Sequence, residues 1–376
     1  MKSHTFRARL RHFRITRFKY AGYLKEIFQF IVAWIIGVSV YTLILVLTFH
    51  EVGVLKYNGL EWLFFALAIG FMIGSINGLF EVFLFKRIFR KMKFIYIVVN
   101  KTLFLLIAFI ITVTLYVFFK KYILIPLGIA DSMTYDSLLD VFASSEIQKH
   151  ALIAIMINFS INFFMMVKKM MGKGVLLNLF LGKYHRPRQE KRIVMFLDLT
   201  SSTAIAEKLD LYKYSSFLKD FFFDIDGAIE DSKGAVFQFV GDEVVILWDI
   251  SDGCENNNCI KFFFDAQDRI KKFESNYLSK YGIIPDFKAG LHYGTVVITE
   301  VGGSKQEIAY HGDAVNTTAR IRSECNSVGK KLLVSAELVS QMQELDRRYI
   351  IESVGVKSFK GKENVVALFS IEKRAH

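Results

Sequence analysis

Proline and cysteine are both scarce in this chain of 376 residues, with three of each. The scarcity of proline, beside 37 phenylalanines, argues against disordered linkers and favours long uninterrupted helices in the apolar part of the chain. Cys254, Cys259 and Cys325 show no CxxC spacing and are odd in number, so neither a disulfide framework nor a zinc ribbon is indicated. Low-complexity segments and repeats of fixed period are absent as well. The composition therefore fits folded protein in a reducing compartment.

Acidic residues are almost missing from three basic stretches, which explain the formal net charge of +12. Residues 1–25 and 86–93 hold eight and five Lys or Arg and no acid, and residues 168–192 hold eight against Glu190 alone. The remainder of the chain is net acidic. Because the basic stretches border apolar segments, the charge indicates a membrane surface and not a nucleic acid partner.

Four apolar segments in the first half are candidates for transmembrane helices, because about 20 helical residues cross a bilayer. They cover residues 27–49, 62–80, 102–119 and 151–167. Lys and Arg near the ends of spans stay on the cytoplasmic side. We therefore expect a cytosolic N-terminus (1–26), a four-helix transmembrane domain (27–167) in the inner (plasma) membrane, and a cytosolic linker (168–192). The first apolar run is too long for a cleaved signal peptide.

Several residues in these spans have more than one interpretation. Gly70, Gly74 and Gly78 recur every four residues and create a flat stripe, which packs either within the bundle, as we favour, or between protomers. His50 and His150 lie at the extracytoplasmic ends of spans one and four, as interfacial residues or, less favoured, as joint ligands of a metal or haem. Lys101 is expected to extend its ammonium toward the interface. The sequence does not identify a ligand of the membrane domain.

From about residue 190 the pattern changes to short apolar strands alternating with amphipathic helices, and we assign residues 193–376 to one α/β (α+β) domain. Predicted helices cover residues 203–230, in two pieces, and 256–280, and a further helix starts near residue 313. Predicted strands cover residues 193–197, 235–240, 243–249, 287–294, 296–301, 307–312, 349–356 and 365–371. The order βαββαβ with extra strands predicts a ferredoxin-like sandwich.

Two aspartates end predicted strands of this domain. Asp198 closes the buried strand 193–197, and Asp242 lies on the tip of the hairpin around Gly241. If these strands are neighbours, both carboxylates face one edge of the sheet and repel each other unless a cation lies between them. Such a pair suits phosphoryl transfer with two metal ions.

The domain resembles the class III nucleotidyl cyclases over residues 190–372. Four ordered motifs carry the resemblance: MFLDLTSST at 195–203, FVGDEVV at 239–245, HGDAVNTTARI at 311–321 and FKGKE at 359–363. It implies that Asp198 and Asp242 bind two Mg²⁺ or Mn²⁺ ions, assisted by the carbonyl of Leu199. It also implies that Asn316 orients the ribose and that Arg320 and Lys360 hold the triphosphate. One helical turn separates Asn316 from Arg320, so their side chains point the same way.

Three substrate-binding positions depart from the family's usual residues or surroundings. Ser201 and Ser202 stand before Thr203 where the family often has Gly-Phe. Gln238 and Ala309 occupy the positions that usually select the base. An amide reads adenine by donating to N1 and accepting from the amino group, and turned over it also serves guanine. We favour ATP on the overall similarity to bacterial adenylate cyclases, with GTP as the alternative.

The resemblance further implies a homodimer, because the family builds each site from the metal ligands of one protomer and the base, Asn and Arg residues of the other. The expected function is thus a membrane-bound adenylate cyclase that makes 3′,5′-cyclic AMP and pyrophosphate, with regulation through the membrane domain as a hypothesis. A guanylate cyclase and a catalytically silent cyclase-like receptor are the alternatives. A transporter or channel is disfavoured, since the spans hold almost no charge.

Overall fold

The computed structural model describes residues 23–24, 26–44, 59–85, 94–126, 137–172, 174–359 and 365–374. Within it the chain divides into two compact units, Met1–Val167 and Lys168–His376, and each is treated by itself. His50 and Lys360 lie outside the described residues.

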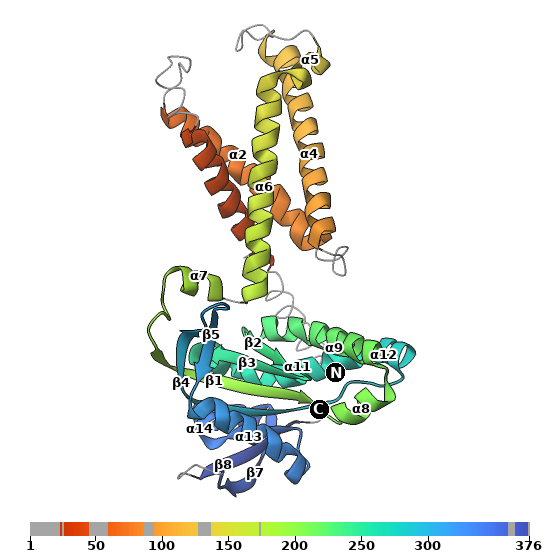
Figure 1. Ribbon diagram of the computed structural model, residues 1–376, viewed down its shortest axis with the longest axis vertical. Coiled ribbons are helices and arrows are strands. Elements are labelled where there is room, and N and C mark those ends of the chain that lie inside the picture. Colours follow the sequence, from red (N-terminus) through yellow and green to blue (C-terminus); the bar gives the residue numbers. More distant parts are fainter. Residues whose placement is uncertain are drawn as a thin grey trace, which may run out of the picture. The chain divides into compact units, whose positions relative to one another are not determined.

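Long helices make up the first unit (Figure 1). They are Glu26–Ile44, α2 (Gly59–Phe80) with the π-helical turn η2 (Glu81–Phe85), α4 (Phe94–Phe119) with η3 (Lys120–Leu124), the short α5 (Leu138–Ala143), and α6 (Ser145–Met171). Among the described residues, three helical stretches are long and apolar enough to cross a membrane, namely Glu26–Ile44, Leu67–Leu84 and Ile147–Met171. These match the first, second and fourth predicted spans. Over the third predicted span the apolar stretch Ile95–Ile111 is shorter, so a total of four spans is not confirmed.

The glycine stripe of α2 packs against the first helix. A Cβ at Gly70 would lie 2.6 Å from the Cα of Ile35, and a Cβ at Gly74 would lie 2.6 Å from the Cα of Ile31. A Cβ at Gly78 would lie 2.9 Å from the Cα of Ile27 on the same helix. Without a side chain, these residues let the two backbones touch. Packing within the bundle is therefore confirmed for the stripe.

Two polar residues of the first unit have specific partners. Tyr41 Oη lies 2.6 Å from His150 Nδ1, which links the first helix to α6. Lys101 Nζ lies 2.5 Å from Glu81 Oε2, and its side chain is only 11% exposed. This ion pair joins α4 to η2. Because it does not place the Lys101 ammonium relative to a membrane surface, its extension toward the interface stays a prediction.

An eight-stranded sheet forms the centre of the second unit. Its strands are β1 (Arg188–Leu199), β2 (Ala235–Val240), β3 (Glu243–Asp249), β4 (Phe287–Val301), β5 (Glu307–His311), β6 (Leu332–Ser335), β7 (Tyr349–Lys357) and β8 (Val366–Lys373). They follow the order β2-β3-β1-β4-β6-β8-β7, with β5 also paired to β4. Only the β4–β6 pair is parallel. The order of the first four strands, β2-β3-β1-β4, fits the predicted βαββαβ motif.

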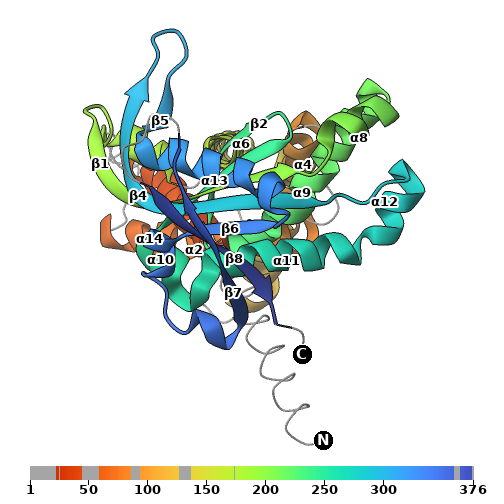
Figure 2. The ribbon, with the colours of Figure 1, turned by 90° about the horizontal axis from the view of Figure 1, so that it is seen from below.

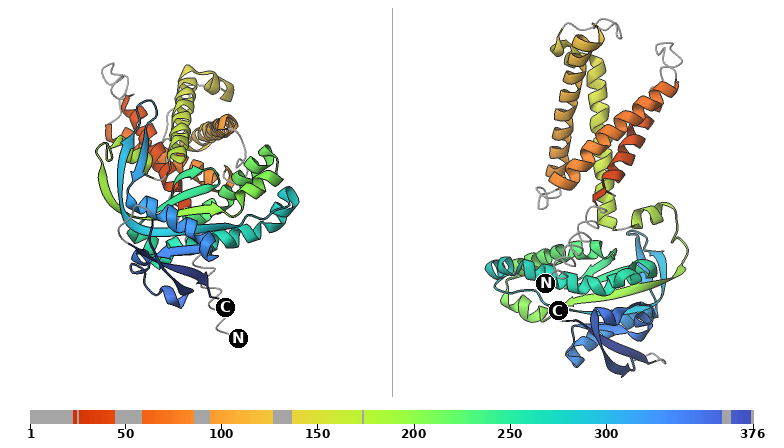
Figure 3. Two further views of the ribbon diagram at one scale, coloured as in Figure 1. Left: turned by 60° about the horizontal axis from the view of Figure 1, so that its bottom comes forward. Right: turned by 180° about the vertical axis from the view of Figure 1, so that it is seen from behind.

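Helices cover both faces of this sheet (Figures 2 and 3). They are α7 (Val175–Phe180), α8 (Ser202–Lys208), α9 (Leu211–Asp231), α10 (Ile250–Cys254), α11 (Asn258–Lys272), α12 (Glu274–Tyr281), α13 (Asp313–Val328) and α14 (Ala336–Val339), with the 3₁₀ turns η4 (Glu255–Asn257) and η5 (Leu345–Arg347). Alternate residues of β1 point to opposite faces. Met195 packs with the phenylalanines of α9 and α11, and Phe196 packs in the cluster that includes Ala314 of α13. β1 is thus buried on both faces, as its apolar run predicts.

Three strands differ from the prediction. Residues 287–294 and 296–301 form the single strand β4, β1 already begins at Arg188, and β6 was not predicted. The two predicted strands were divided after Gly294, where an added Cβ would lie 2.8 Å from the Cβ of Ala314. This glycine therefore makes room for α13 within a continuous strand.

Candidate active site

Strand register places the two predicted metal-binding aspartates side by side. Asp198, the penultimate residue of β1, lies directly opposite Glu243, the first residue of β3. Asp242 precedes Glu243 in the β2–β3 turn, where Gly241 supplies the positive φ of 61° that a two-residue hairpin needs at its first position. Asp242 therefore lies beside Asp198, close enough to raise the pKa of the Asp198 carboxyl group.

The surroundings of these carboxyl groups disfavour negative charge. Burial raises the pKa of Asp198, and the neighbouring Asp242 raises it further, although Arg322 and Lys288 oppose both effects. Burial also raises the pKa of Glu243, against the attraction of Arg322. Burial raises the pKa of the Tyr214 hydroxyl on α9, and the nearby charges of Asp242 and Asp198 raise it further. A cation bound at the cluster would therefore favour the charged form of these carboxyl groups.

Two basic side chains of the same chain contact the cluster. Lys288, opposite Asp198 on the β4 side of β1, places Nζ 3.4 Å from Asp198 Oδ2. Arg322 of α13 places Nη1 3.1 Å from Asp198 Oδ2 and Nη2 2.6 Å from Glu243 Oε2. One guanidinium therefore connects the ends of β1 and β3.

The position of Arg322 depends on close packing between α13 and β4. A Cβ at Gly290 would lie 2.8 Å from the Cα of Arg322 and 2.9 Å from the carbonyl carbon of Ile321. Because position 290 has no side chain, the helix backbone rests directly on the strand. This contact fixes the distance between α13 and the carboxylates.

The other two predicted residues of α13 face away from the cluster. Asn316 is exposed and Arg320 is half-buried. Residues four apart share a helix face, whereas residues two apart point in nearly opposite directions. When Arg322 reaches the carboxylates of its own chain, Arg320 and Asn316 therefore point elsewhere.

The two positions predicted to select the base lie on β2, the first strand in the sheet order, and on β5, which pairs with β4. Gln238 is exposed, and Ala309 is buried with 9% exposure. Their neighbours Phe237 and Tyr310 pack edge to face, with ring centroids 4.8 Å apart. The sheet therefore brings strands β2 and β5 together although three strands separate them in its order.

The remaining predicted residues lie near the end of β1 or outside the described residues. Leu199 is the buried last residue of β1, and Thr203 is exposed in the first turn of α8. Lys360 is outside the described residues, directly after Phe359, which is buried in a cluster with Ile321 of α13.

The donors at the cluster suit a hard divalent cation. Asp198, Asp242 and the carbonyl of Leu199 offer only oxygen, which Mg²⁺ and Mn²⁺ prefer. Among the described residues no group of three or more His, Cys, Asp or Glu side chains is arranged to hold a metal. The two aspartates therefore fit ions that complete their coordination with substrate phosphates and water, as Mg²⁺ commonly does.

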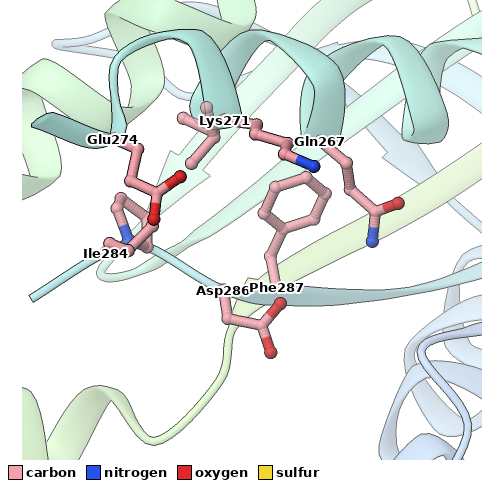
Figure 4. A pocket seen from close by; sticks show the side chains of 8 residues that line it. Gln267, Lys271, Glu274, Ile284, Asp286 and Phe287 are labelled. Carbon is pink, nitrogen blue, oxygen red and sulfur yellow. The ribbon is translucent and has the colours of Figure 1, made fainter.

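Two hollows of the second unit lie away from this cluster. Figure 4 shows a hollow of about 240 Å³ between α11, α12 and the start of β4, lined by Gln267, Lys271, Glu274 and Asp286 among others. Another, of about 400 Å³, lies between α11 and β8. Neither is lined by a residue that the sequence predicts for the site.

Comparison with known proteins identifies the second unit. Residues 185–372 match the family model "Adenylate and Guanylate cyclase catalytic domain", which covers half of the chain. The chain belongs to this family. Its second unit is therefore a class III nucleotidyl cyclase catalytic domain, the catalytic module of a group of lyases.

Individual relatives agree with this assignment. The cyclase domain lies in a region 32% identical over 209 residues to adenylate cyclase 2 of Rhizobium meliloti (strain 1021), covering 56% of this chain and 57% of the relative. Adenylate cyclase of Anabaena cylindrica is 27% identical over 189 residues, or 48% of this chain and 36% of that protein. The chain thus matches little more than half of the length of the first relative and about a third of the length of the second. A bacterial light-regulated adenylyl cyclase has a similar fold, with a TM-score of 0.51 and 19% identity over 63% of this chain and 68% of that one.

Sequence reasoning missed four residues of this cyclase site: Glu243, Lys288, Arg322 and Tyr214. Glu243 and Lys288 are the cross-strand neighbours of Asp198, so only the strand register reveals them. Arg322 follows the motif residue Arg320 by two positions. On a helix this spacing indicates that the two arginines point in nearly opposite directions, and it was the sequence signal for a separate role of Arg322.

Proposed function

We propose that the protein is a membrane-bound adenylate cyclase that converts ATP to 3′,5′-cyclic AMP and pyrophosphate. The observation that carries this proposal is the pair of adjacent carboxyl groups of Asp198 and Asp242 at the joined ends of β1 and β3. When bound there, two Mg²⁺ or Mn²⁺ ions supply charge for activating the ribose hydroxyl and for stabilising the departing pyrophosphate. In this proposal Asp198, Asp242 and the carbonyl of Leu199 hold the ions.

The substrate would be held by residues that point away from these ligands. Asn316 orients the ribose, and Arg320 and Lys360 neutralise the charge that develops on the phosphates. Thr203 contributes beside the phosphates, and Gln238 and Ala309 border the base. Because Asn316 and Arg320 do not share the helix face of Arg322, they suit a site whose metal ligands come from a second copy. This supports a homodimer with two equivalent sites.

An assay with both nucleotides tests the activity. The full chain in detergent or lipid nanodiscs is incubated with Mn²⁺ and either ATP or GTP, and both cyclic products are measured. We expect cyclic AMP from ATP and a loss of at least about 10²-fold in Asp242→Ala, because the metal site then lacks a ligand. Asp265→Ala, which removes an aspartate paired only with Lys261 on α11, is the matched control and retains activity. Absence of any cyclic product in the wild type contradicts the proposal.

The choice of base is tested at Gln238. An amide serves adenine or guanine according to its orientation, so GTP remains the alternative substrate. We expect Gln238→Glu, which can only accept hydrogen bonds when ionised, to favour GTP over ATP relative to the wild type. Cyclic GMP as the main product of the wild type would assign the protein as a guanylate cyclase.

Complementation tests the shared site. Asp242→Ala and Arg320→Ala are each expected to be inactive, but they damage different halves of a site. In a one-to-one mixture half of the dimers are mixed and each has one intact site, so about a quarter of wild-type activity returns. No recovery after subunit exchange contradicts the shared site.

We also propose that the helices of the first unit anchor the protein in the plasma membrane, with the cyclase domain in the cytosol. Three apolar helices and the basic stretches beside them support this placement. Because α6 leads directly into the cyclase domain, the membrane helices are also suited to regulate it. A variant lacking residues 1–182 that keeps full activity and dimerisation contradicts that regulation.

A further inference from the structure

An arginine of the cyclase domain lies where a divalent cation would be attracted. Arg322 contacts Asp198 at 3.1 Å through Nη1 and Glu243 at 2.6 Å through Nη2. The side chains of both acids are only 12% exposed, so their charges are poorly screened by water. Asp198 and Glu243 face each other across β1 and β3, where two like charges destabilise the pair. Arg322 offsets this repulsion.

Arginine suits this task better than lysine. Its planar guanidinium presents several N–H donors in a fixed fork, and here two separate nitrogens reach two separate carboxylates. Lys288, by comparison, contacts Asp198 in the cluster and donates a hydrogen bond from Nζ to Asn326 Oδ1, at 2.9 Å. Arg322 is therefore the cation that joins the two strand ends.

A metal ion bound between Asp198 and Asp242 would draw on the same negative charge. Asp198 Oδ2 is the oxygen that Arg322 and Lys288 both contact. A dication at the neighbouring oxygens is repelled by a guanidinium only a few ångströms away, and the low exposure of the cluster strengthens that repulsion. Arg322 and the metal thus oppose each other at one carboxylate.

We propose that Arg322 is a positioning residue that acts as an internal counter-cation: it holds Asp198 and Glu243 together before metal binds, and it lowers the affinity of the site for divalent cations. The proposal rests on the metal site of the proposed function. Arg322 therefore has a different role from Arg320, which lies two residues before it on α13. Cation concentration would then limit activity more strongly than in a site without this arginine.

Mn²⁺ binding to the full chain without nucleotide tests the proposal. Electron paramagnetic resonance measures the free aqueous ion, so it reports binding and not catalysis. We expect Arg322→Gln to bind Mn²⁺ about tenfold more tightly than the wild type, because a neighbouring positive charge is gone. Arg322→Lys, which keeps the charge, should stay within about twofold of the wild type. Arg269→Gln removes an arginine paired with Asp231 away from the site, and it should leave binding unchanged.

Thermal unfolding supplies a second measurement. Without metal, Arg322→Gln should unfold at a lower temperature than the wild type, since two facing carboxylates lose their shared partner. Mn²⁺ should then raise its unfolding temperature by more than it raises that of the wild type. Circular dichroism before heating confirms that the variant is folded, and Arg322→Lys provides a milder variant if it is not.

The result that overturns the proposal is unchanged or weaker Mn²⁺ binding in folded Arg322→Gln. Weaker binding would mean that the arginine assists the metal. The double variant Asp198→Asn, Asp242→Asn separates this failure from failure of the proposed function. If the double variant binds Mn²⁺ as well as the wild type, the metal site itself is wrong. If it loses binding while Arg322→Gln matches the wild type, only the role of Arg322 is refuted.

Discussion

Replacing Gly290 by alanine is a sharp test of how α13 is positioned. The added Cβ would meet the backbone nitrogen of Arg322 most closely and would lie 2.8 Å from its Cα, whereas ordinary contacts at a Cβ begin near 3.4 Å. The neighbour is helix backbone and not a flexible side-chain end, so α13 must retreat by about 0.5–1 Å. Such overpacking typically costs about 1–3 kcal/mol of stability. A displacement of about 1 Å in catalytic groups costs about 10²-fold in rate.

The expected result for Gly290→Ala is therefore a ten- to hundredfold loss of cyclase activity with a folded protein. Asn316 and Arg320 shift together with Arg322, because all three lie on α13. Cyclic nucleotide formation gives the rate, and thermal unfolding gives the stability. Gly303→Ala is the matched control, since a Cβ at Gly303 meets no atom within 4 Å. It should keep both quantities near the wild-type values.

Two outcomes would refute this reasoning. Activity of Gly290→Ala within about threefold of the wild type would show that the site tolerates the displacement. A loss of stability equal to that of Gly303→Ala would show that the contact between helix and strand is looser than its geometry indicates. In either case the packing of α13 on β4 does not set the site.

Three further predictions concern the metal ligands and the helical unit. Without metal, Asp198→Asn should unfold at a temperature no lower than the wild type, because burial and Asp242 disfavour the Asp198 carboxylate. The variant should nevertheless lose cyclase activity, and a clear loss of stability would contradict this account of the Asp198 carboxylate. Mn²⁺ should raise the unfolding temperature of the wild type but not that of Asp242→Asn, and equal shifts would contradict the assigned ligands. Gly74→Val should lower the unfolding temperature of the full chain in detergent, because a Cβ at that position would lie 2.6 Å from the backbone of the first helix. Leu79→Val, at an exposed site on α2, is its control, and equal stability of the two variants would contradict the packing.

Much of the cyclase fold follows from local sequence patterns. The apolar run at 193–197 predicts the central strand, and Gly241-Asp242 predicts the hairpin that brings the second aspartate to it. The helix over 203–230 divides near Asp210, which caps α9 through its bond to the N–H of Lys213. Each of these features depends on residues close together in the chain.

Features that depend on contacts between distant segments were not predictable in the same way. Lys288 meets Asp198 only because β1 and β4 pair in one particular register, and a single sequence does not specify that register. The space that Gly294 leaves for Ala314 likewise depends on another element, so the continuity of β4 past this glycine was not predicted. The ion pair of Lys101 with Glu81 likewise joins two helices. Hydropathy gives the apolar length of each helix but not such partners.

The two sides of α13 give the proposed enzyme a physical means of coupling its two sites. Arg322 contacts the strands of its own chain that carry the proposed metal ligands, whereas Asn316 and Arg320 face away and, in the proposed dimer, serve the site built on the partner's aspartates. One rigid helix then contributes to both sites, because its residues cannot shift independently of one another. A change in the angle between the protomers would leave the Arg322 contacts within each chain intact but move Asn316 and Arg320 relative to the opposite metal ligands. Regulation through the membrane helices would therefore alter the turnover rate far more than the Mn²⁺ affinity measured without nucleotide.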